Sequence, residues 1–341
     1  MKESDAHAPA RTMPVAKFIS NDNAGLWARQ TPDGDGVVGD IRFAFDSART
    51  DYDFLVAFNG VPEHFADRVK RSRTIFVAGE PTGIKRYERR FLAQFGTIVT
   101  TDRETPHPNR IASHGGIPWQ IGIPMKHAGT SRKCLDYRAL ERLTNKRTKL
   151  LSVICSTKTI TPAQRLRIPF VQALKSHFGE RLDVFGRGFH EIDDKAEGLV
   201  NYRFHVALEN SDEPDYWSEK IADPFIAGAF PFYWGCRNLE DYFPQNSFGR
   251  VDLGDPRSAI ATIEAAIAGE RDRGAEPALA EAKRRVLNDH NLFALIGRVL
   301  PRLPNRIWER ARRIAPEAVF FRRPLLHRAA TRARAALYRT S

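Results

Sequence analysis

Residues 206–235 read VALENSDEPDYWSEKIADPFIAGAFPFYWG, and this stretch is the clearest guide to the fold. It begins with an apolar run, turns acidic and polar, and continues as a helix-compatible segment followed by a second apolar run. Buried strands that alternate with helices are typical of a parallel sheet covered on both faces. Ligands bind such sheets at the carboxyl ends of the strands. The polar residues after the first apolar run are therefore candidate ligand-binding groups.

The helix expected after Ser218 offers a site for an anion. Its first turn has free N–H groups and a partial positive charge, and Lys220 adds a full charge there. Tyr216 lies four positions before Lys220, so its ring can border the same pocket. A diphosphate would fit this arrangement. In the alternative interpretation Ser218 only caps the helix, Glu219 balances its dipole, and Lys220 is solvated.

Two polar residues, Glu209 and Asn210, close the strand that precedes this helix. The amide of Asn210 can both donate and accept hydrogen bonds, which suits a ribose or the edge of a base. Three further acidic residues, Asp212, Glu213 and Asp215, are interpreted as part of a solvated connecting loop.

The alternation of apolar runs and helix-compatible stretches occurs twice along the chain, on either side of a region rich in proline and glycine. We therefore expect two α/β domains that face each other across a cleft, with a boundary near Lys149. The expected units are a loose N-terminus (1–14), a first domain (15–148), a second domain (149–288) and a basic C-terminal segment of amphipathic helices (289–341).

Length and composition agree with two buried cores. The chain has 341 residues, of which 42% are apolar. Its three cysteines show no metal-ligand spacing, which favours a reducing compartment. The N-terminus MKESDAHAPARTMPVAKF lacks a secretory apolar core, and no segment approaches the roughly 20 apolar residues that cross a bilayer. We expect a cytoplasmic protein, soluble or peripheral on the inner face of the membrane.

The basic excess is concentrated at the end of the chain. The formal net charge is +12, and from position 298 onward twelve arginines face two glutamates, an excess of ten positive charges. Basic amphipathic helices suit an anionic membrane surface, so residues 314–341 are expected to contact lipid, whereas the part up to about 313 packs across the two domains. A nucleic-acid-binding tail is the alternative; the nearly neutral body of the chain argues against nucleic acid as a partner.

The motif YRFHVALENS…DYWSEKIADPFIAGAFPFYWG resembles the donor-binding motif of the α1,3/α1,4-fucosyltransferases, glycosyltransferase family 10. Shorter matches are RLRIPFVQAL, LDVFGRG and FPQNSFGRVDL in the second half and DYDFLVAFNG and RTIFVAGEP in the first, so that residues 50 to 270 are roughly covered. The resemblance implies a GT-B fold with two Rossmann-like domains. It also implies transfer of L-fucose from GDP-β-L-fucose to a glycan hydroxyl with inversion.

The resemblance also implies roles for single residues. Glu80 in VAGEP would be the general base that removes the proton from the acceptor hydroxyl. Arg167 in RLRIPF would bind phosphate together with Lys220, and Arg165 is the alternative if the register is shifted. Glu219 would accept from the ribose hydroxyls.

Asn210 and Tyr216 would line the nucleotide-sugar pocket, and Gly186 in FGRG would let the backbone approach the nucleotide. Neither a metal nor a cofactor is expected, and the acidic pair Asp193-Asp194 is interpreted as surface. The expected acceptor is GlcNAc or Glc of a bacterial surface polysaccharide or of its lipid-linked precursor. A transferase for another GDP-hexose is the second hypothesis.

Overall fold

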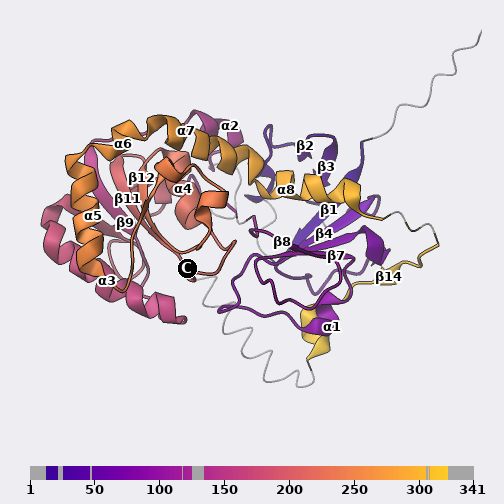
Figure 1. Cartoon of the computed structure of the whole chain (residues 1–341). Helices are drawn as coiled ribbons and strands as arrows, with labels where there is room; N and C mark the ends of the chain where they lie inside the picture. Colours follow the sequence, from indigo (N-terminus) through magenta and orange to yellow (C-terminus); the bar gives the residue numbers. More distant parts are fainter. Residues whose placement is uncertain are drawn as a thin grey trace, which may run out of the picture.

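The computed structural model describes residues 13–21, 26–46, 48–116, 118–124, 134–304, 306 and 308–321. The chain forms two α/β halves, each built around its own sheet, which lie side by side in Figure 1. The N-terminal dozen residues and residues 322–341 of the basic tail, for which lipid contact is predicted, lie outside the described residues.

The first half contains a seven-stranded sheet with the strand order β2-β3-β1-β4-β6-β7-β8. All neighbouring strands are parallel except β2, which pairs antiparallel with β3. The strands are β1 (Val15–Ser20), β2 (Val37–Val38), β3 (Ile41–Ala44), β4 (Phe54–Phe58), β6 (Thr74–Val77), β7 (Thr97–Thr100) and β8 (Arg110–Ala112).

Connections in the first half are mostly turns and loops, where the sequence pattern suggests helices. Among the described residues of this half, α1 (Arg89–Leu92) is the α-helix between strands, and it has four residues. Pro62, Pro81 and Gly83 lie in these connections and oppose helix formation, because proline lacks an amide donor and glycine loses more backbone entropy.

The second half contains a five-stranded parallel sheet with the order β10-β9-β11-β12-β13. Its strands are β9 (Lys149–Ile154), β10 (Leu182–Phe185), β11 (Tyr202–Leu208), β12 (Phe230–Trp234) and β13 (Gly249–Arg250). Its helices are α2 (Tyr137–Arg142), α3 (Pro162–Phe178), α4 (Glu219–Ala227), α5 (Pro256–Ala268), α6 (Arg271–Gly274) and α7 (Glu276–Arg284).

The two helices that border the site begin at well-defined caps. Thr161 accepts a hydrogen bond from the Gln164 amide, and the Gln164 side chain accepts from the Thr161 amide, so α3 begins with a capping box. Ser218 accepts from the Lys220 amide and caps α4. Gly228, in the left-handed conformation at φ 76°, ends α4.

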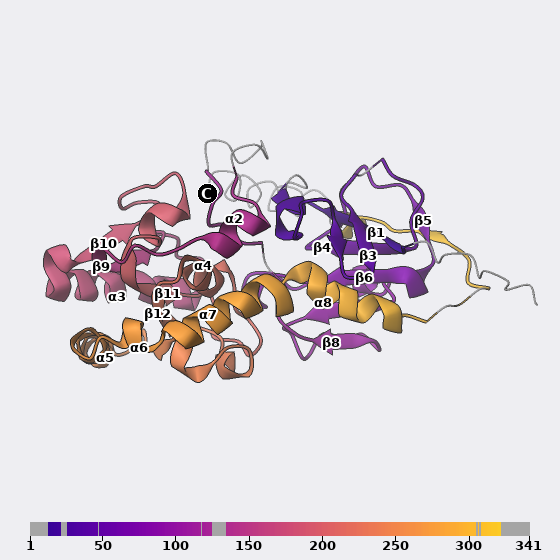
Figure 2. The ribbon, with the colours of Figure 1, turned by 90° about the horizontal axis from the view of Figure 1, so that it is seen from above.

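The C-terminal part of the second domain returns to the first. After α7 and a π-helical turn (Arg285–Asp289), α8 (Leu292–Val299) lies across the first sheet, as Figure 2 shows from above. Phe293 of α8 packs its ring against Phe18 at 5.4 Å and Phe43 at 4.9 Å. Burial of this apolar face stabilises the pair of domains through the hydrophobic effect.

Both faces of the first sheet are therefore covered. Phe54, Val56 and Phe58 of β4 belong to the cluster that contains α8, whereas Leu55 and Ala57 face the opposite cluster around α1. That second cluster also contains Ile314, which is 1% exposed, from the segment after α8. Strand β14 (Arg312–Arg313) pairs antiparallel with β5 (Arg68–Val69) in the same region.

Two stretches pack differently from the expected division of the chain. Trp119, Ile121, Tyr137 and Leu140 precede the boundary expected near Lys149, yet their side chains belong to the core of the second half. Residues 314–320 fall in the segment expected to contact lipid, but Ile314 and Phe320 of this segment pack on the first half. In both cases burial of apolar side chains decides the position. None of the described helices combines the length and the apolarity that a membrane span needs.

Candidate active site

A pocket of about 600 Å³ lies between the two halves, at the carboxyl ends of the second-domain strands. The loops after β9, β10 and β11, the first two turns of α3 and the start of α4 supply most of its wall, and Leu26 and Trp27 of the first half and residues 118–120 complete it. This is the edge at which doubly wound sheets bind ligands. Five of the residues expected at the site line this pocket: Arg167, Gly186, Asn210, Glu219 and Lys220.

Arg167 enters the pocket from α3 and holds the end of β11. Its Nη1 donates to Asn210 Oδ1 at 2.9 Å, and Gln164 Nε2 donates to the same oxygen at 3.2 Å. Arg167 is 3% exposed, and its Nε has no hydrogen-bond partner among the described residues. A buried guanidinium with an unused donor is suited to bind an anionic ligand. Arg165, in contrast, is exposed on the outer side of the same helix, where it donates to the carbonyl of Thr159.

Glu219 lies between two lysines at the start of α4. Its Oε1 is 3.0 Å from Lys220 Nζ and 3.1 Å from Lys195 Nζ. Burial acts to raise the pKa of Glu219, but the two ammonium groups outweigh it and hold the pKa well below its usual range. Burial acts to lower the pKa of Lys220, and Glu219 and Glu209 raise it above its usual value. The Glu219 carboxylate and the Lys220 ammonium group are therefore charged at neutral pH.

Glu209 supports the start of α4 from below the pocket. It is fully buried and accepts from the Ser218 amide at 2.8 Å and from the Ser218 hydroxyl at 2.6 Å. Burial raises the pKa of Glu209. Glu209, Ser218 and Tyr216, which is 3% exposed, do not belong to the pocket lining; Glu209 and Ser218 instead fix the turn that presents Lys220.

Gly186 brings bare backbone to the wall of the pocket. It has φ +113°, and a Cβ atom at this position would lie 2.2 Å from the carbonyl oxygen of Cys155. A side chain is therefore excluded both by conformation and by space.

Glu80 approaches from the first domain. It follows β6, is half-buried, and interacts electrostatically with Lys158, which lines the pocket. Asn59 Oδ1 accepts from the amide of Gly79 at 2.6 Å and fixes the turn just before Glu80. Burial lowers the pKa of Lys158, Arg187 and the other nearby cations lower it further, and Glu80 opposes this shift.

The pocket thus carries more positive charge than the sequence motifs indicate. Lys158, Arg187 and Lys195 line it together with Arg167 and Lys220. The three additional cations lie after β9 and β10; Arg187 falls inside the FGRG motif without having been singled out, and no motif contains Lys158 or Lys195. A set of converging cations with a free guanidinium N–H is suited to a group such as a diphosphate.

Asp223 is a further buried acid that the sequence did not single out. It lies one helical turn after Glu219, is 1% exposed and lines the pocket. Its Oδ1 accepts from the Gln120 amide at 3.1 Å, while Oδ2 accepts no hydrogen bond from a described residue and lies 3.8 Å from Lys195 Nζ. Burial, with a contribution from Glu219, raises the pKa of Asp223 to about 7.

The loop between β11 and α4 spans the two domains, contrary to its interpretation as a solvated connection. Glu213 accepts two hydrogen bonds from Thr82, and Asp215 pairs with Arg103, both partners being residues of the first domain. Asp212 fits the expectation, since it pairs with Arg237 at the surface. Contacts between residues more than a hundred positions apart cannot be read from local sequence.

Within the part of the chain that the structure describes, no group of three or more His, Cys, Asp or Glu side chains could hold a metal ion. The acidic pair is expected at the surface, but Asp193 lines the pocket, and Asp194 caps the 3₁₀ turn Lys195–Gly198 and accepts from the Gly122 amide through Oδ1 at 2.9 Å.

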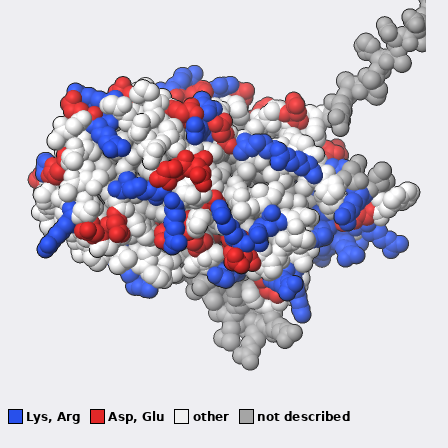
Figure 3. Space-filling model, in the orientation of Figure 1, with Lys and Arg blue, Asp and Glu red and all other residues white. Residues whose placement is uncertain are grey.

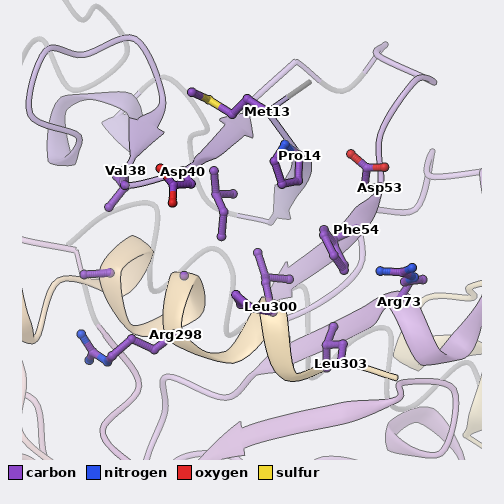
Figure 4. Close-up of a pocket in the computed structure, with 15 residues that line it drawn as sticks. Met13, Pro14, Val38, Asp40, Asp53, Phe54, Arg73, Arg298, Leu300 and Leu303 are labelled. Atoms are coloured by element: carbon purple, nitrogen blue, oxygen red, sulfur yellow. The ribbon is translucent and has the colours of Figure 1, made fainter. Parts of the chain in front are cut away.

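A second cavity, of about 1000 Å³, lies beside α8 (Figure 4). It is bordered by the amino ends of β1, β4 and β6, the edge opposite to the one that binds ligands in such sheets. Two of its charged groups are already engaged: Asp53 accepts from the Val15 amide at 2.8 Å, and Arg73 stacks on Phe54. The smaller pocket is therefore the better candidate for the active site.

Two Rossmann-like domains with a cationic pocket between them define a GT-B type glycosyltransferase fold, as expected. Comparison with known proteins agrees: a crystal structure of an α1,3-fucosyltransferase with GDP superposes with a TM-score of 0.50 at 15% identity, covering 90% of this chain and 95% of that chain. At this identity the likeness shows the fold alone.

Residues 144–263 match the sequence model of the glycosyltransferase family 10 (fucosyltransferase) C-terminal region, so this part of the chain is similar to that family. The α-(1,3)-fucosyltransferase 4 of Rattus norvegicus is 35% identical over 96 residues, or 26% of this chain and 22% of that protein. The α-(1,3)-fucosyltransferase B of Drosophila melanogaster is 42% identical over 66 residues, or 19% of this chain and 15% of that protein. The chain thus spans less than a quarter of the length of these relatives.

Proposed function

We propose that this protein is an inverting fucosyltransferase that moves L-fucose from GDP-β-L-fucose to a hydroxyl of a glycan, with an α1,3- or α1,4-type linkage. The observation that carries the proposal is the electrostatic interaction of Glu80, a residue of the first domain, with Lys158 of the pocket wall; Glu80 itself does not line the pocket. A donor held by the second domain would then place its sugar next to a carboxylate of the first. The family of the second domain and the names of its relatives support fucose as the sugar.

In the proposed reaction Glu80 takes the proton of the acceptor hydroxyl. The hydroxyl oxygen attacks C1 of fucose, the bond between C1 and the phosphate oxygen breaks, and GDP leaves with that electron pair. Arg167 and Lys220 stabilise the negative charge that develops on the leaving diphosphate. Glu219, ionised between Lys195 and Lys220, accepts hydrogen bonds from the ribose hydroxyls.

A GDP-release assay tests the proposal. GDP-fucose is offered with a panel of galactose- and N-acetylglucosamine-ended acceptors, and the anomeric configuration of the product is read by NMR. Glu80→Gln should lower kcat by about 10²-fold or more, as expected for loss of a general base, while GDP binding stays within about twofold of wild type. Glu63→Gln, at an exposed position of the same domain, is the matched control.

Three results would contradict parts of this proposal. Full activity of Glu80→Gln would remove Glu80 as the base. A β-linked product would exclude single displacement. Turnover of another GDP-hexose with none of GDP-fucose would favour the second hypothesis, a GT-B transferase with a different donor. The expected acceptor remains GlcNAc or Glc of a bacterial surface polysaccharide or its lipid-linked precursor, and the same panel tests it.

Nucleic acid binding is a weaker alternative. On the face shown in Figure 3, lysines and arginines are interspersed with aspartates and glutamates over most of the surface and gather only at its right edge, over the first half. We further propose that the protein is cytoplasmic and contacts the inner face of the membrane through its C-terminal residues. The relevant segment is shorter than 314–341, because Ile314 and Phe320 pack on the first domain.

A further inference from the structure

The turn that carries Glu80 is held by a residue of the other domain. Thr82 Oγ1 donates to Glu213 Oε1 at 2.6 Å, and the Thr82 amide donates to Glu213 Oε2 at 3.2 Å. Both oxygens of one carboxylate are thus engaged by one residue. This double contact fixes orientation as well as distance, because rotation of the carboxylate would break at least one of the two bonds.

The link from Thr82 to Glu80 is short and stiff. Only Pro81 separates them, and its ring restricts φ to a narrow range. The amides of Ile84 and Lys85 donate to the Pro81 carbonyl at 2.9 and 3.0 Å and close the turn. A displacement of Thr82 would therefore move Glu80 as well.

The opposite side of this turn is also tied down. Glu317 accepts from the Glu88 amide at 2.8 Å and pairs with Lys85 at 2.7 Å. The turn is thus fixed on its outer side within the first domain. From the second domain, Glu213 holds the turn at Thr82.

Glu213 belongs to the loop that also carries donor-site groups. It lies three positions after Asn210, which binds Arg167, and three positions before Tyr216, whose amide donates to the Glu213 carbonyl at 3.3 Å. The hydroxyl of Ser211 donates to Glu213 Oε1 at 3.1 Å and orients the carboxylate toward Thr82. The loop between β11 and α4 therefore contacts both the donor pocket and the turn that carries Glu80.

We infer that Glu213 is a positioning residue that holds Glu80 in register with the donor pocket through Thr82. This role rests on the proposed fucosyl transfer. Glu213 itself does not touch the reacting atoms; it acts by joining the base of one domain to the donor loop of the other. The contact therefore matters for kcat and not for donor affinity.

Hydrogen exchange tests the contact without reference to activity. In the full-length Glu213→Ala variant, amide exchange within residues 79–88 should become about tenfold faster, because the Thr82 amide loses its acceptor and the turn loses an anchor. Exchange in β6, at residues 74–77, should stay unchanged. Asp212→Ala is the matched control, since it alters the neighbouring acid of the same loop, whose partner Arg237 lies in the same domain.

Kinetics test the consequence. Glu213→Ala should lower kcat about tenfold, whereas the Kd for GDP and the KM for GDP-fucose stay within twofold of wild type. Glu213→Gln keeps one acceptor oxygen and should recover part of the loss. Adding Thr82→Val to Glu213→Ala should lower kcat by a smaller factor than Thr82→Val lowers it in the wild-type protein, because both changes remove the same contact.

Unchanged amide exchange in residues 79–88 would show that the contact between Glu213 and Thr82 does not fix this turn, and would overturn the inference. Faster exchange with a kcat within twofold of wild type would overturn the positioning role, as would an equal loss of GDP affinity and kcat. A wild-type chain that binds GDP but transfers no fucose would count against the proposed function, and in that case the exchange measurement still decides whether Glu213 fixes the turn.

Discussion

Lys195 Nζ lies 3.1 Å from Glu219 Oε1, so the acid of the donor motif is paired with a lysine from the loop after β10, 24 positions earlier in the chain. This lysine also lies 3.8 Å from Asp223, so its ammonium group is near the carboxyl groups of both Glu219 and Asp223. The motif around α4 is thus completed by a residue that does not belong to it.

We predict that Lys195→Ala weakens GDP binding about tenfold, the equivalent of roughly 1.4 kcal/mol for one lost charge-assisted contact. Removal of the ammonium should also raise the pKa of Glu219, since Lys195 is the largest influence that lowers it. Calorimetric titration with GDP at pH 7 measures the change. Affinity equal to that of wild type would mean that Lys195 only stabilises the fold.

Two arginines of α3 provide a matched pair. Arg167→Ala should raise the Kd for GDP by a factor of about 10 to 100, because it removes a buried guanidinium from the pocket and leaves Asn210 with one donor fewer. Arg165→Ala, two positions away and exposed, should leave the Kd within twofold. The reverse order of the two effects would show that Arg165 is the phosphate ligand.

Asp223 should make stability depend on pH. Because the folded pKa is about 7 and the unfolded value is 3.8, the native carboxyl keeps its proton in this interval while the unfolded one has lost it. Stability is therefore fully present at low pH and falls as the pH rises through 7. Asp223→Asn should remove the share of the stability loss that comes from Asp223. The difference in Tm between this variant and wild type should therefore be about 2–8 °C more favourable to the variant at pH 8 than at pH 5.

Thermal unfolding of wild type, Asp223→Asn and the exposed control Asp212→Asn at the two pH values measures this effect. Parallel pH dependence of all three proteins would refute the assignment to Asp223.

Two C-terminal truncations should behave differently. Ending the chain after Arg313 removes Ile314, which is buried against the first domain, and Glu317, which pairs with Lys85. We expect a fall in Tm of several degrees, since burying one aliphatic side chain contributes about 1.5–3 kcal/mol. Ending it after Phe321 keeps these contacts and should leave Tm unchanged.

The truncation after Phe321 also tests the proposed membrane contact. If residues 322–341 bind anionic lipid, the shorter protein should no longer float with vesicles that contain phosphatidylserine, while the full chain does. Equal flotation of both proteins would place the lipid contact elsewhere or exclude it.

From the sequence by itself, the apolar runs predict strands in both sheets. The sequence also determines which polar groups follow β11 and begin α4. These features are local: an apolar run forms a buried strand, and Ser218, Glu219 and Lys220 follow one another at a helix start. The length of the motif also indicated a resemblance to glycosyltransferase family 10, and the match over residues 144–263 bears this out for that region.

Only the tertiary structure decided which other residues join this group. Arg167 faces the pocket and Arg165 does not, because the rotation of α3 is set by its packing on the sheet. Lys195, Asp223 and the pair formed by Thr82 and Glu213 depend on loops that meet across long stretches of chain. Such contacts arise from the packing of whole domains, and they cannot be predicted from the spacing of residues along the chain.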